Sequence, residues 1–334
     1  MPFSAQTSPA DSPSHLQSSR ACAHRLSRRT LLKGVGGLAA ASVIGGGAVV
    51  AGSAPAQAAL TVAEHEDHGR MQYYKLATSS IGWLPRVNVL LPDGYDTSRR
   101  YPVLFLLHGG GENYSTFDTK YDIRNHTAGR DLIVVMPDGG AAGWYCDPES
   151  SNVGPRNWET FHIKELIPWV DATFSTTGQA SGRAVSGFSM GGFGALKYAA
   201  KYPELFGSVS SHSGPADLRI QEGAVVHWAN FTAGATDLKG GTIYGIPWDQ
   251  ARVSADNPVE HVESYRGKRV FLVSGTESDR YESVVLPSQQ SFGKALDGAG
   301  ISYERYEDTG AHVVRWGRMR QDIDSLLNHF AKAG

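Results

Sequence analysis

From residue 101 onward, short runs of consecutive apolar residues alternate with longer segments whose apolar residues recur every three or four positions. A continuous apolar run is typical of a parallel strand buried on both faces, and the longer period is typical of an amphipathic helix. Residues 72–77 and 86–91 are predicted as an antiparallel edge. The expected fold class is α/β, with a mostly parallel central sheet flanked by helices. The pattern predicts strands at 103–107, 132–136, 184–187, 208–211, 270–273 and 303–307, and helices at 159–174, 286–296 and 318–330.

The segment 215–266 interrupts this alternation. It is rich in Gly, Asp and Asn, and it carries Trp228, Tyr244 and Trp248 without a clear period. Long irregular segments inside a domain are usually functional or disordered, and three large aromatic residues argue against disorder. We therefore expect an insertion that lies over the functional site.

The N-terminal segment has the features of an export signal. Residues 27–33, SRRTLLK, carry paired arginines ahead of an apolar run rich in Gly and Ala, and residues 56–58, AQA, form a small-residue cleavage site. A membrane anchor over 31–51 is the alternative, but its many glycines make that run only mildly hydrophobic. We predict a twin-arginine signal peptide at 1–58, cleaved near Ala58, and a secreted single domain at 59–334 without a stable membrane anchor.

Charge and cysteine content narrow the possible partners. Removal of 1–58 leaves 26 basic and 32 acidic residues of the original 31 and 33. No Lys or Arg cluster remains, so we expect no nucleic-acid partner. Cys22 leaves with the signal and Cys146 has no partner, so stability must come from a hydrophobic core. Residues 65–68, HEDH, are interpreted as a solvated leader. We predict no metal and no cofactor. The sequence pattern favours neither a monomer nor an oligomer.

The segment 184–194, AVSGFSMGGFG, predicts a nucleophile elbow. The G-x-S-x-G pattern alone is weak in a chain with 39 glycines. Here it follows a predicted strand and precedes a segment with helical spacing, which is the context that the elbow requires. Ser189 is therefore the candidate nucleophile.

A serine nucleophile needs a histidine base, and that histidine needs a carboxylate to orient it. In this fold the chain order is serine, acid, histidine. His312 follows the predicted strand 303–307 and precedes the last helix, as the order requires. The acid is expected after strand 270–273, where Asp279 is favoured and Glu277 is the alternative, with Asp217 as a remote third.

The oxyanion that forms during acyl transfer needs main-chain N–H donors. Met190, directly after the nucleophile, is the first candidate, and Gly110 or Gly111 in the run 108–111, HGGG, is the second. Trp144, Trp158 and His108 are candidate substrate contacts, with ordinary packing at the rim as the alternative for the tryptophans.

Three sequence features together resemble a known family. The run 157–161, NWETF, the elbow GFSMGG, and His312 with Trp316 are similar to the esterase D and antigen 85 group of α/β hydrolases, over roughly 74–330. The resemblance implies an α/β-hydrolase fold and a triad of Ser189, His312 and one of the two acids. The group includes carboxylesterases, secreted mycolyltransferases that acylate trehalose, and a secreted relative regarded as inactive.

The chain departs from the mycolyltransferases at the sugar-binding loop. Those enzymes carry an aspartate and an arginine where this chain has His108 and Gly111, and HGGG is typical of the esterases. Their paired cysteines are also missing. We therefore expect a serine esterase that hydrolyses a small-molecule or lipid ester through an acyl-enzyme. The alternatives are an acyltransferase to a sugar or glycerol hydroxyl, and a catalytically silent binding protein on the same fold.

Overall fold

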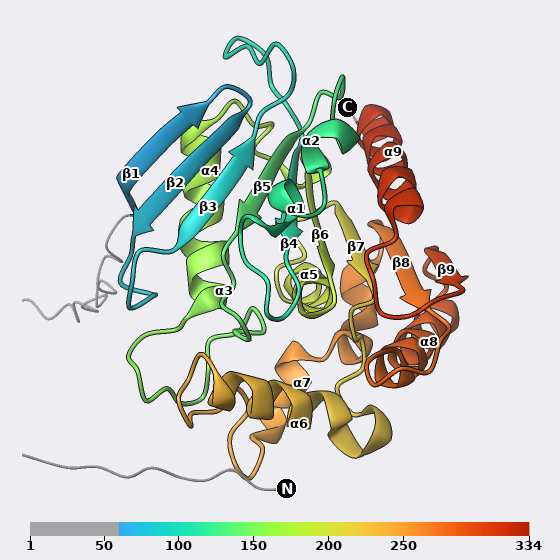
Figure 1. The fold of residues 1–334 in the computed structure, drawn as a ribbon. Helices are drawn as coiled ribbons and strands as arrows, with labels where there is room; N and C mark the ends of the chain where they lie inside the picture. The colour runs from blue at the N-terminus through green and yellow to red at the C-terminus, as the bar shows by residue number, and fades with distance from the viewer. Residues whose placement is uncertain (1–59, 334) are drawn as a thin grey trace, which may run out of the picture. The chain divides into compact units, whose positions relative to one another are not determined.

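The computed structural model describes residues 60–333, and the predicted signal peptide at 1–58 lies outside them. Within these residues one sheet of nine strands has the order β1-β2-β3-β5-β4-β6-β7-β8-β9 (Figure 1). Strands β4 to β9 run parallel to one another. Strands β1, β2 and β3 add an antiparallel flank beside β5. Their bounds are β1 Thr61–His68, β2 Met71–Ala77, β3 Arg86–Leu90, β4 Val103–Leu107, β5 Ile133–Pro137, β6 Arg183–Phe188, β7 Ser208–His212, β8 Arg269–Gly275 and β9 Glu304–Asp308.

The predicted strands and the antiparallel edge are present, and the α/β-hydrolase fold class is confirmed. The interpretation of 65–68 as a solvated leader is wrong, because these residues belong to β1 and pair with β2. All eight side chains of β1 are exposed, so this edge strand has no apolar alternation by which its sequence could be recognised.

Helices cover both faces of the sheet, because residues along the buried strands point alternately to either side. In β4, Phe105 packs with the helices of one face and Leu106 with those of the other. The first face holds α3 Trp158–Thr160, α4 Ile167–Thr173, α5 Met190–Lys201 and α8 Glu282–Gly298, and the second holds α1 Thr116–Thr119, α2 Ile123–His126 and α9 Trp316–Ala333. A π-helical segment, Phe161–Leu166, joins α3 to α4 and completes the predicted helix 159–174.

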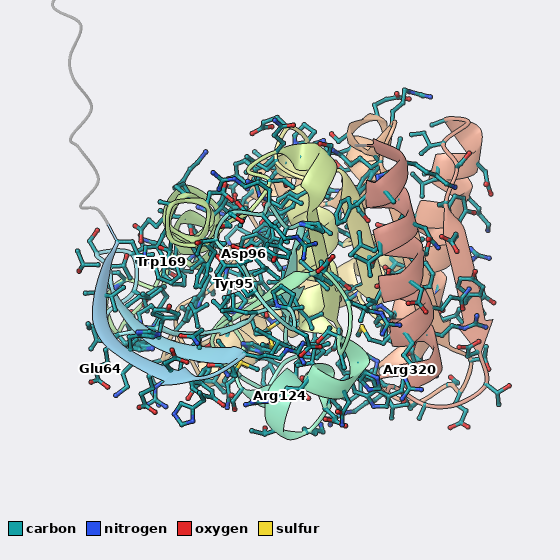
Figure 2. All side chains as sticks on the ribbon, turned by 90° about the horizontal axis from the view of Figure 1, so that it is seen from above. Glu64, Tyr95, Asp96, Arg124, Trp169 and Arg320 are labelled. Atoms are coloured by element: carbon teal, nitrogen blue, oxygen red, sulfur yellow. The ribbon has the colours of Figure 1, made fainter. Side chains whose placement is uncertain are left out.

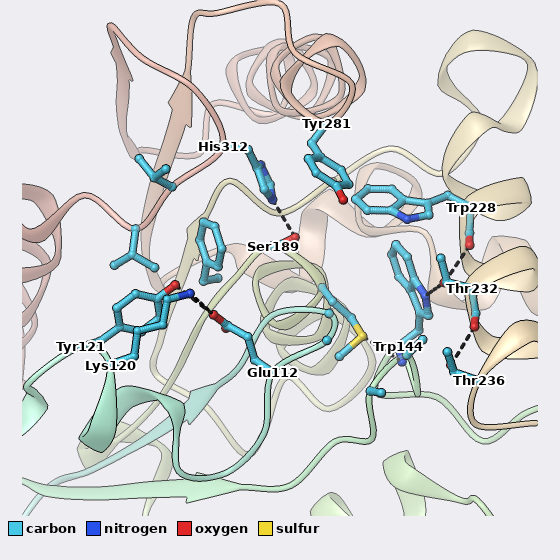
Figure 3. Close-up of a pocket in the computed structure, with 18 residues that line it drawn as sticks. Glu112, Lys120, Tyr121, Trp144, Ser189, Trp228, Thr232, Thr236, Tyr281 and His312 are labelled. Carbon is cyan, nitrogen blue, oxygen red and sulfur yellow. Dashed lines mark hydrogen bonds and ion pairs between the residues drawn. The ribbon is translucent and has the colours of Figure 1, made fainter. Parts of the chain in front are cut away.

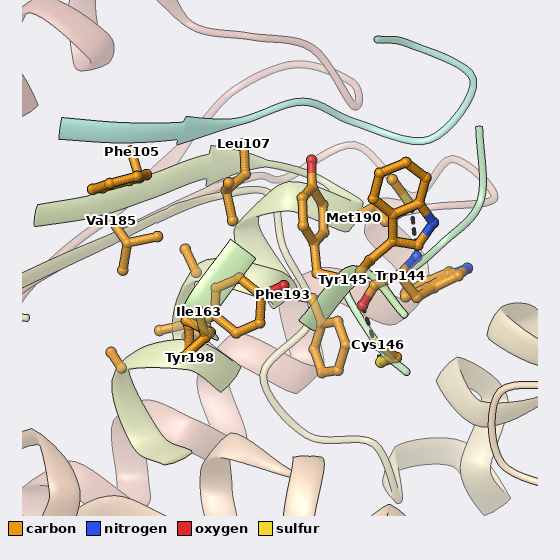
Figure 4. Packing of buried hydrophobic residues seen from close by; sticks show 14 of the residues in the cluster. Phe105, Leu107, Trp144, Tyr145, Cys146, Ile163, Val185, Met190, Phe193 and Tyr198 are labelled. Carbon is orange, nitrogen blue, oxygen red and sulfur yellow. Dashed lines mark hydrogen bonds between the residues drawn. The ribbon is translucent and has the colours of Figure 1, made fainter. Parts of the chain in front are cut away.

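Helix α5 packs closely against the centre of the sheet. Gly194 lets the Tyr145 ring pack against this helix, because a Cβ on Gly194 would lie 2.6 Å from the ring (Figure 4). The nucleophile turn therefore has a rigid support on its inner side.

The segment 215–266 forms α6 Ile220–Ala235, α7 Gln250–Asp256 and a 3₁₀ stretch, Pro258–Tyr265. Trp228 and Thr232 of α6 line the cavity above Ser189, so the predicted insertion over the site is present. Among the described residues there is no helix of the length and apolarity that a membrane span requires.

Candidate active site

Ser189 lies in the sharp turn between β6 and α5, and its backbone has φ 55° and ψ −118°. This conformation is strained for a residue with a side chain. A Cβ on Gly187 would lie 2.4 Å from the carbonyl carbon of Gly191, and one on Gly191 would lie 2.1 Å from the Leu107 oxygen. The two glycines are therefore required for strand, turn and helix to approach one another. The turn holds the Ser189 hydroxyl at the floor of a cavity.

His312 reaches the same point from the loop after β9. Its Nε2 lies 2.8 Å from Ser189 Oγ (Figure 3). The imidazole is enclosed by two aromatic rings, with centroid distances of 4.9 Å to Phe188 and 4.9 Å to Tyr281. This packing fixes the ring plane, so the base points at the hydroxyl without a large loss of side-chain entropy.

The carboxylate on the other side of the imidazole belongs to Glu282. Its Oε1 lies 3.1 Å from His312 Nδ1, and the side chain is buried. The prediction of Asp279, with Glu277 as the alternative, is therefore wrong for this contact. The acid was expected in the loop after β8, whereas Glu282 is the first residue of helix α8. The helix predicted at 286–296 begins after Glu282, so the apolar pattern gave no signal for this residue.

Asp279 instead organises the main chain around the base. Its Oδ2 accepts the backbone N–H of His312 at 2.8 Å, and its Oδ1 accepts those of Tyr281 and Glu282 at 2.7 Å each. Desolvation raises the pKa of this carboxyl, but the three N–H donors outweigh it and leave the pKa below its usual value. Asp279 thus positions both the histidine and the acid. Asp217 lies elsewhere, where it accepts the Ser291 hydroxyl.

Two main-chain N–H groups beside Ser189 have no hydrogen-bond partner within residues 60–333. One belongs to Met190, the first residue of α5, where the helix dipole is positive. The other belongs to Gly110. Of the two predicted donors in the HGGG run, Gly111 is excluded because its N–H donates to Ala141 O at 2.7 Å. Glu112 steadies this loop by accepting the Gly109 N–H at 3.0 Å.

The cavity over Ser189 has a volume of about 550 Å³. One end is aromatic, where the Trp228 ring lies 5.0 Å from Trp144 and 5.3 Å from Tyr281 between centroids. The opposite end is polar, where Lys120 Nζ lies 3.0 Å from Glu112 Oε1 (Figure 3). The nucleophile therefore lies between a cluster of aromatic rings and an ion pair.

Trp144 lines the cavity as predicted, in a loop whose backbone is strained. Trp144 and Tyr145 have φ of 50° and 56°. Buried Lys197 of α5 donates to Tyr145 O at 2.7 Å and pairs with Glu159 at 2.7 Å. Glu159 of the NWETF run thus acts through Lys197 to hold the cavity wall, a structural role for this motif.

Trp158 and His108 do not line the cavity, so the prediction that they contact substrate is wrong. Trp158 is fully buried. It packs against the loop after β5, so closely that a Cβ on Gly143 would lie 2.3 Å from its ring. His108 is 1% exposed, and its Nε2 accepts the Gly139 N–H at 2.9 Å. Both rings hold loops in place from behind.

Two other kinds of site, a reactive thiol and a metal centre, are not found within residues 60–333. Burial raises the pKa of the Cys146 thiol to about 12, so this sulfur is not a thiolate at neutral pH. Among residues 60–333 no group of three or more His, Cys, Asp or Glu side chains is arranged to hold a metal ion. The Ser189 cavity is therefore the candidate active site.

Comparison with known proteins agrees with this geometry. Residues 78–316 match the Esterase family, described as "Putative esterase". The esterase Rv1288 of Mycobacterium tuberculosis is 57% identical over 277 residues, which are 80% of this chain and 60% of that protein. The MPT51/MPB51 antigen of the same species is 27% identical over 244 residues, 68% of this chain and 78% of the antigen.

A solved structure shows the same fold. An S-formylglutathione hydrolase from Agrobacterium tumefaciens superposes with a TM-score of 0.65 at 18% identity, over 82% of this chain and 99% of that one. The chain spans about 60% of the length of Rv1288, so its match covers one part of that longer protein.

Proposed function

This chain belongs to the Esterase family of α/β hydrolases, and from that membership we propose that it is a serine esterase with Ser189, His312 and Glu282 as its triad. The observation that carries the proposal is that His312 stands between the nucleophile and the acid at the floor of the cavity. Its Nε2 lies 2.8 Å from Ser189 Oγ, and its Nδ1 lies 3.1 Å from Glu282 Oε1. The esterase name of its 57% identical relative supports the same reaction class.

In the first step, Ser189 Oγ attacks the ester carbonyl carbon and His312 Nε2 takes the hydroxyl proton. Glu282 accepts the hydrogen bond from Nδ1–H, which fixes the tautomer and stabilises the imidazolium. The carbonyl oxygen becomes an oxyanion and accepts hydrogen bonds from the N–H groups of Met190 and Gly110. Collapse expels the alcohol, which leaves with the proton from His312.

In the second step, water attacks the acyl-enzyme while His312 again takes a proton. The carboxylic acid is released and Ser189 recovers its hydroxyl. Two compartments suit an ester with unlike halves: the acyl group lies against Trp144 and Trp228, and a polar alcohol lies toward Lys120 and Glu112. The substrate class is a small-molecule or lipid ester.

Hydrolysis of 4-nitrophenyl esters of increasing acyl length tests the proposal. The wild type should release 4-nitrophenol, and Ser189→Ala should reduce kcat/KM by at least about 10⁴-fold. Ser79→Ala, an exposed serine on the antiparallel flank, is the matched control and should leave the rate unchanged. A folded wild type without activity on any ester would support the binding-protein alternative. Mainly acylated glycerol, formed when glycerol is present, would reassign the protein as an acyltransferase.

We also propose that residues 1–58 direct export through the twin-arginine pathway and are removed near Ala58. The support is the sequence SRRTLLK, the weakly hydrophobic run behind it and the small residues at 56–58. Replacement of Arg28 and Arg29 by Lys should remove the protein from the culture medium. A wild-type protein that stays in the cells with its first residues intact would contradict export.

A further inference from the structure

A second hollow lies on the antiparallel flank. We call it the Asn88 groove and define it by Glu64, Glu66, Tyr73, Arg86, Asn88 and Tyr114; its volume is about 350 Å³. The β1–β2–β3 register places Glu66, Tyr73 and Asn88 in one cross-strand row on one face of the sheet. Tyr74 and its partner Val87 point to the opposite face, where Tyr74 packs on Trp169. Figure 2 shows Glu64 and Trp169 on opposite sides of the curved β1–β2 ribbon.

Asn88 is the unusual residue of the groove. Its side chain is completely buried, and neither Oδ1 nor Nδ2 has a hydrogen-bond partner within residues 60–333. A buried amide without partners is costly, and native structures contain few of them. The carbonyl oxygen is an acceptor and the NH₂ group is a donor. A ligand that satisfies both ends must carry donors and acceptors close together, as adjacent hydroxyl groups do.

The charged side chains of the groove, which Lys75 and His68 also line, balance one another. Lys75 Nζ lies 2.5 Å from Glu64 Oε2, and His68 Nε2 lies 3.3 Å from Glu66 Oε2. Arg86 donates to the Tyr114 hydroxyl at 2.5 Å. Two basic and two acidic side chains line the groove, so it offers no net attraction to an anion or a cation. The complementary ligand is neutral and polar.

Two tyrosines supply apolar surface beside this polar floor. Tyr73 is fixed, because its hydroxyl donates to Asp118 at 3.1 Å and accepts from Arg124 at 2.8 Å. Tyr114 forms the wall opposite the strands and is held by Arg86. Aromatic rings with polar tips suit ligands that combine apolar faces with hydroxyl edges.

We propose that the Asn88 groove is a binding site for a neutral saccharide, whose adjacent hydroxyls bond both ends of the Asn88 amide while its C–H faces lie on the tyrosines. The site goes beyond the esterase assignment, because binding there requires none of the triad residues. The loop from Gly110 to Lys120 lines both hollows: Gly110 and Glu112 face the catalytic cavity, and Tyr114 faces the groove.

The test is isothermal titration of the Ser189→Ala protein with maltohexaose, xylohexaose and mannohexaose, so that ester chemistry plays no part. We expect saturable binding of at least one of them, and Asn88→Leu should weaken it about tenfold or more. Asn328→Leu makes the same chemical change at an exposed position of helix α9 and should leave the affinity unchanged. Tyr114→Ala, at a partly exposed position, gives a second reading that does not depend on a buried substitution, and it should also weaken binding.

Several outcomes overturn the proposal. One is no saturable binding of any of the three sugars at 10 mM. Another is an affinity that Asn88→Leu and Tyr114→Ala leave unchanged. Equal or tighter binding of hexagalacturonate would contradict the neutral preference, and tighter binding of a neutral hexapeptide would reassign the site. If Asn88→Leu only raises Tm, while binding persists, Asn88 is a buried amide without a ligand.

Discussion

This molecule contains two groups in which serine, histidine and acid side chains contact one another. The first is Ser189, His312 and Glu282 at the floor of the catalytic cavity. The second is Ser210, His212 and Asp322, together with Arg269, between the sheet and helix α9. The groups share residue types but differ in the order of their contacts and in their access to solvent.

In the catalytic group the histidine stands between the serine and the acid, so a proton can pass from the hydroxyl to the ring. In the second group the acid stands in the middle. Asp322 accepts the Ser210 hydroxyl at 2.7 Å, lies 2.9 Å from His212 Nε2 and accepts Arg269 at 2.7 Å. His212 Nδ1 faces no partner among residues 60–333.

The second group therefore ties helix α9 to strands β7 and β8 and lacks a base directed at a hydroxyl. It still supports the first, because the His212 carbonyl accepts the Ser189 N–H at 2.8 Å. The order of the contacts and an open cavity, rather than residue types, therefore distinguish a catalytic group from a structural one. Changes in the first group should affect turnover, and changes in the second should affect stability.

After the loss of Ser189 itself, the largest expected effect comes from the acid of the catalytic group. Glu282→Gln keeps the shape but removes the charge that orients His312 and stabilises its protonated form. We expect kcat for a 4-nitrophenyl ester to fall about 10³- to 10⁴-fold, on the order of 4 to 5.5 kcal/mol in activation free energy. Asp279→Asn, which perturbs only positioning, should cost about tenfold. Equal losses in the two variants would erase the distinction between the carboxylates.

The next effect concerns the second group, whose role is structural. Asp322→Asn leaves the buried Arg269 guanidinium without its main counter-charge, so the free energy of unfolding in urea should fall by about 3 to 5 kcal/mol. Activity per folded molecule should stay within about threefold of wild type. Asp324→Asn, on the exposed side of the same helix, is the control and should change stability little. A loss of turnover without a loss of stability would place Asp322 in the catalytic machinery.

The stability of the wild-type protein and of Asp322→Asn should depend differently on pH in acid. Burial raises the pKa of Asp322, but the Arg269 charge and the hydrogen bonds from His212 and Ser210 outweigh it and lower the pKa from 3.8 to about 2. A carboxyl with a depressed folded-state pKa stabilises the protein above its unfolded value, and this stabilisation is lost as the pH falls from 4 toward 2. The loss amounts to about 2 kcal/mol. Asp322→Asn should lack this part of the acid denaturation profile, and identical profiles would contradict the assignment.

A further stability difference separates the two serines. Ser210→Ala removes one hydrogen bond to a buried carboxylate and should lower the free energy of unfolding by about 1.5 to 3 kcal/mol, with esterase activity retained. Ser189→Ala should leave stability unchanged or raise it, because it removes a polar group that serves only the reaction. Thermal melts of both proteins, together with rates on one ester, measure the contrast. A destabilised Ser189→Ala would indicate a structural role for the nucleophile.

The sequence predicted those parts of the molecule that depend on local patterns. Apolar runs mark the buried strands, and the glycines around Ser189 mark the turn, since each pattern reflects a constraint on a few neighbouring residues. Met190 follows from its place after the nucleophile. The exposed strand β1 has no such pattern, because its pairing with β2 rather than burial defines it.

The errors concern contacts between distant segments. Glu282 and Asp279 both precede His312 in the chain. The path of the chain into α8 determines that Glu282 contacts the His312 ring and that Asp279 accepts the His312 main-chain N–H. Trp158 and His108 were assigned to the cavity from their place near its loops, but their side chains turn into the core. The choice of Gly110 over Gly111 depends on one contact with Ala141.

The central claim is that Ser189 is the one serine of these two groups that reacts with an acyl-type electrophile. The most direct test is intact-mass analysis after treatment with a fluorophosphonate, followed by peptide mapping of the modified residue. We expect one adduct on Ser189, a greatly slowed reaction in Glu282→Gln, and none at this position in Ser189→Ala. A folded protein that stays unmodified, or that carries the adduct on Ser210, would contradict this assignment.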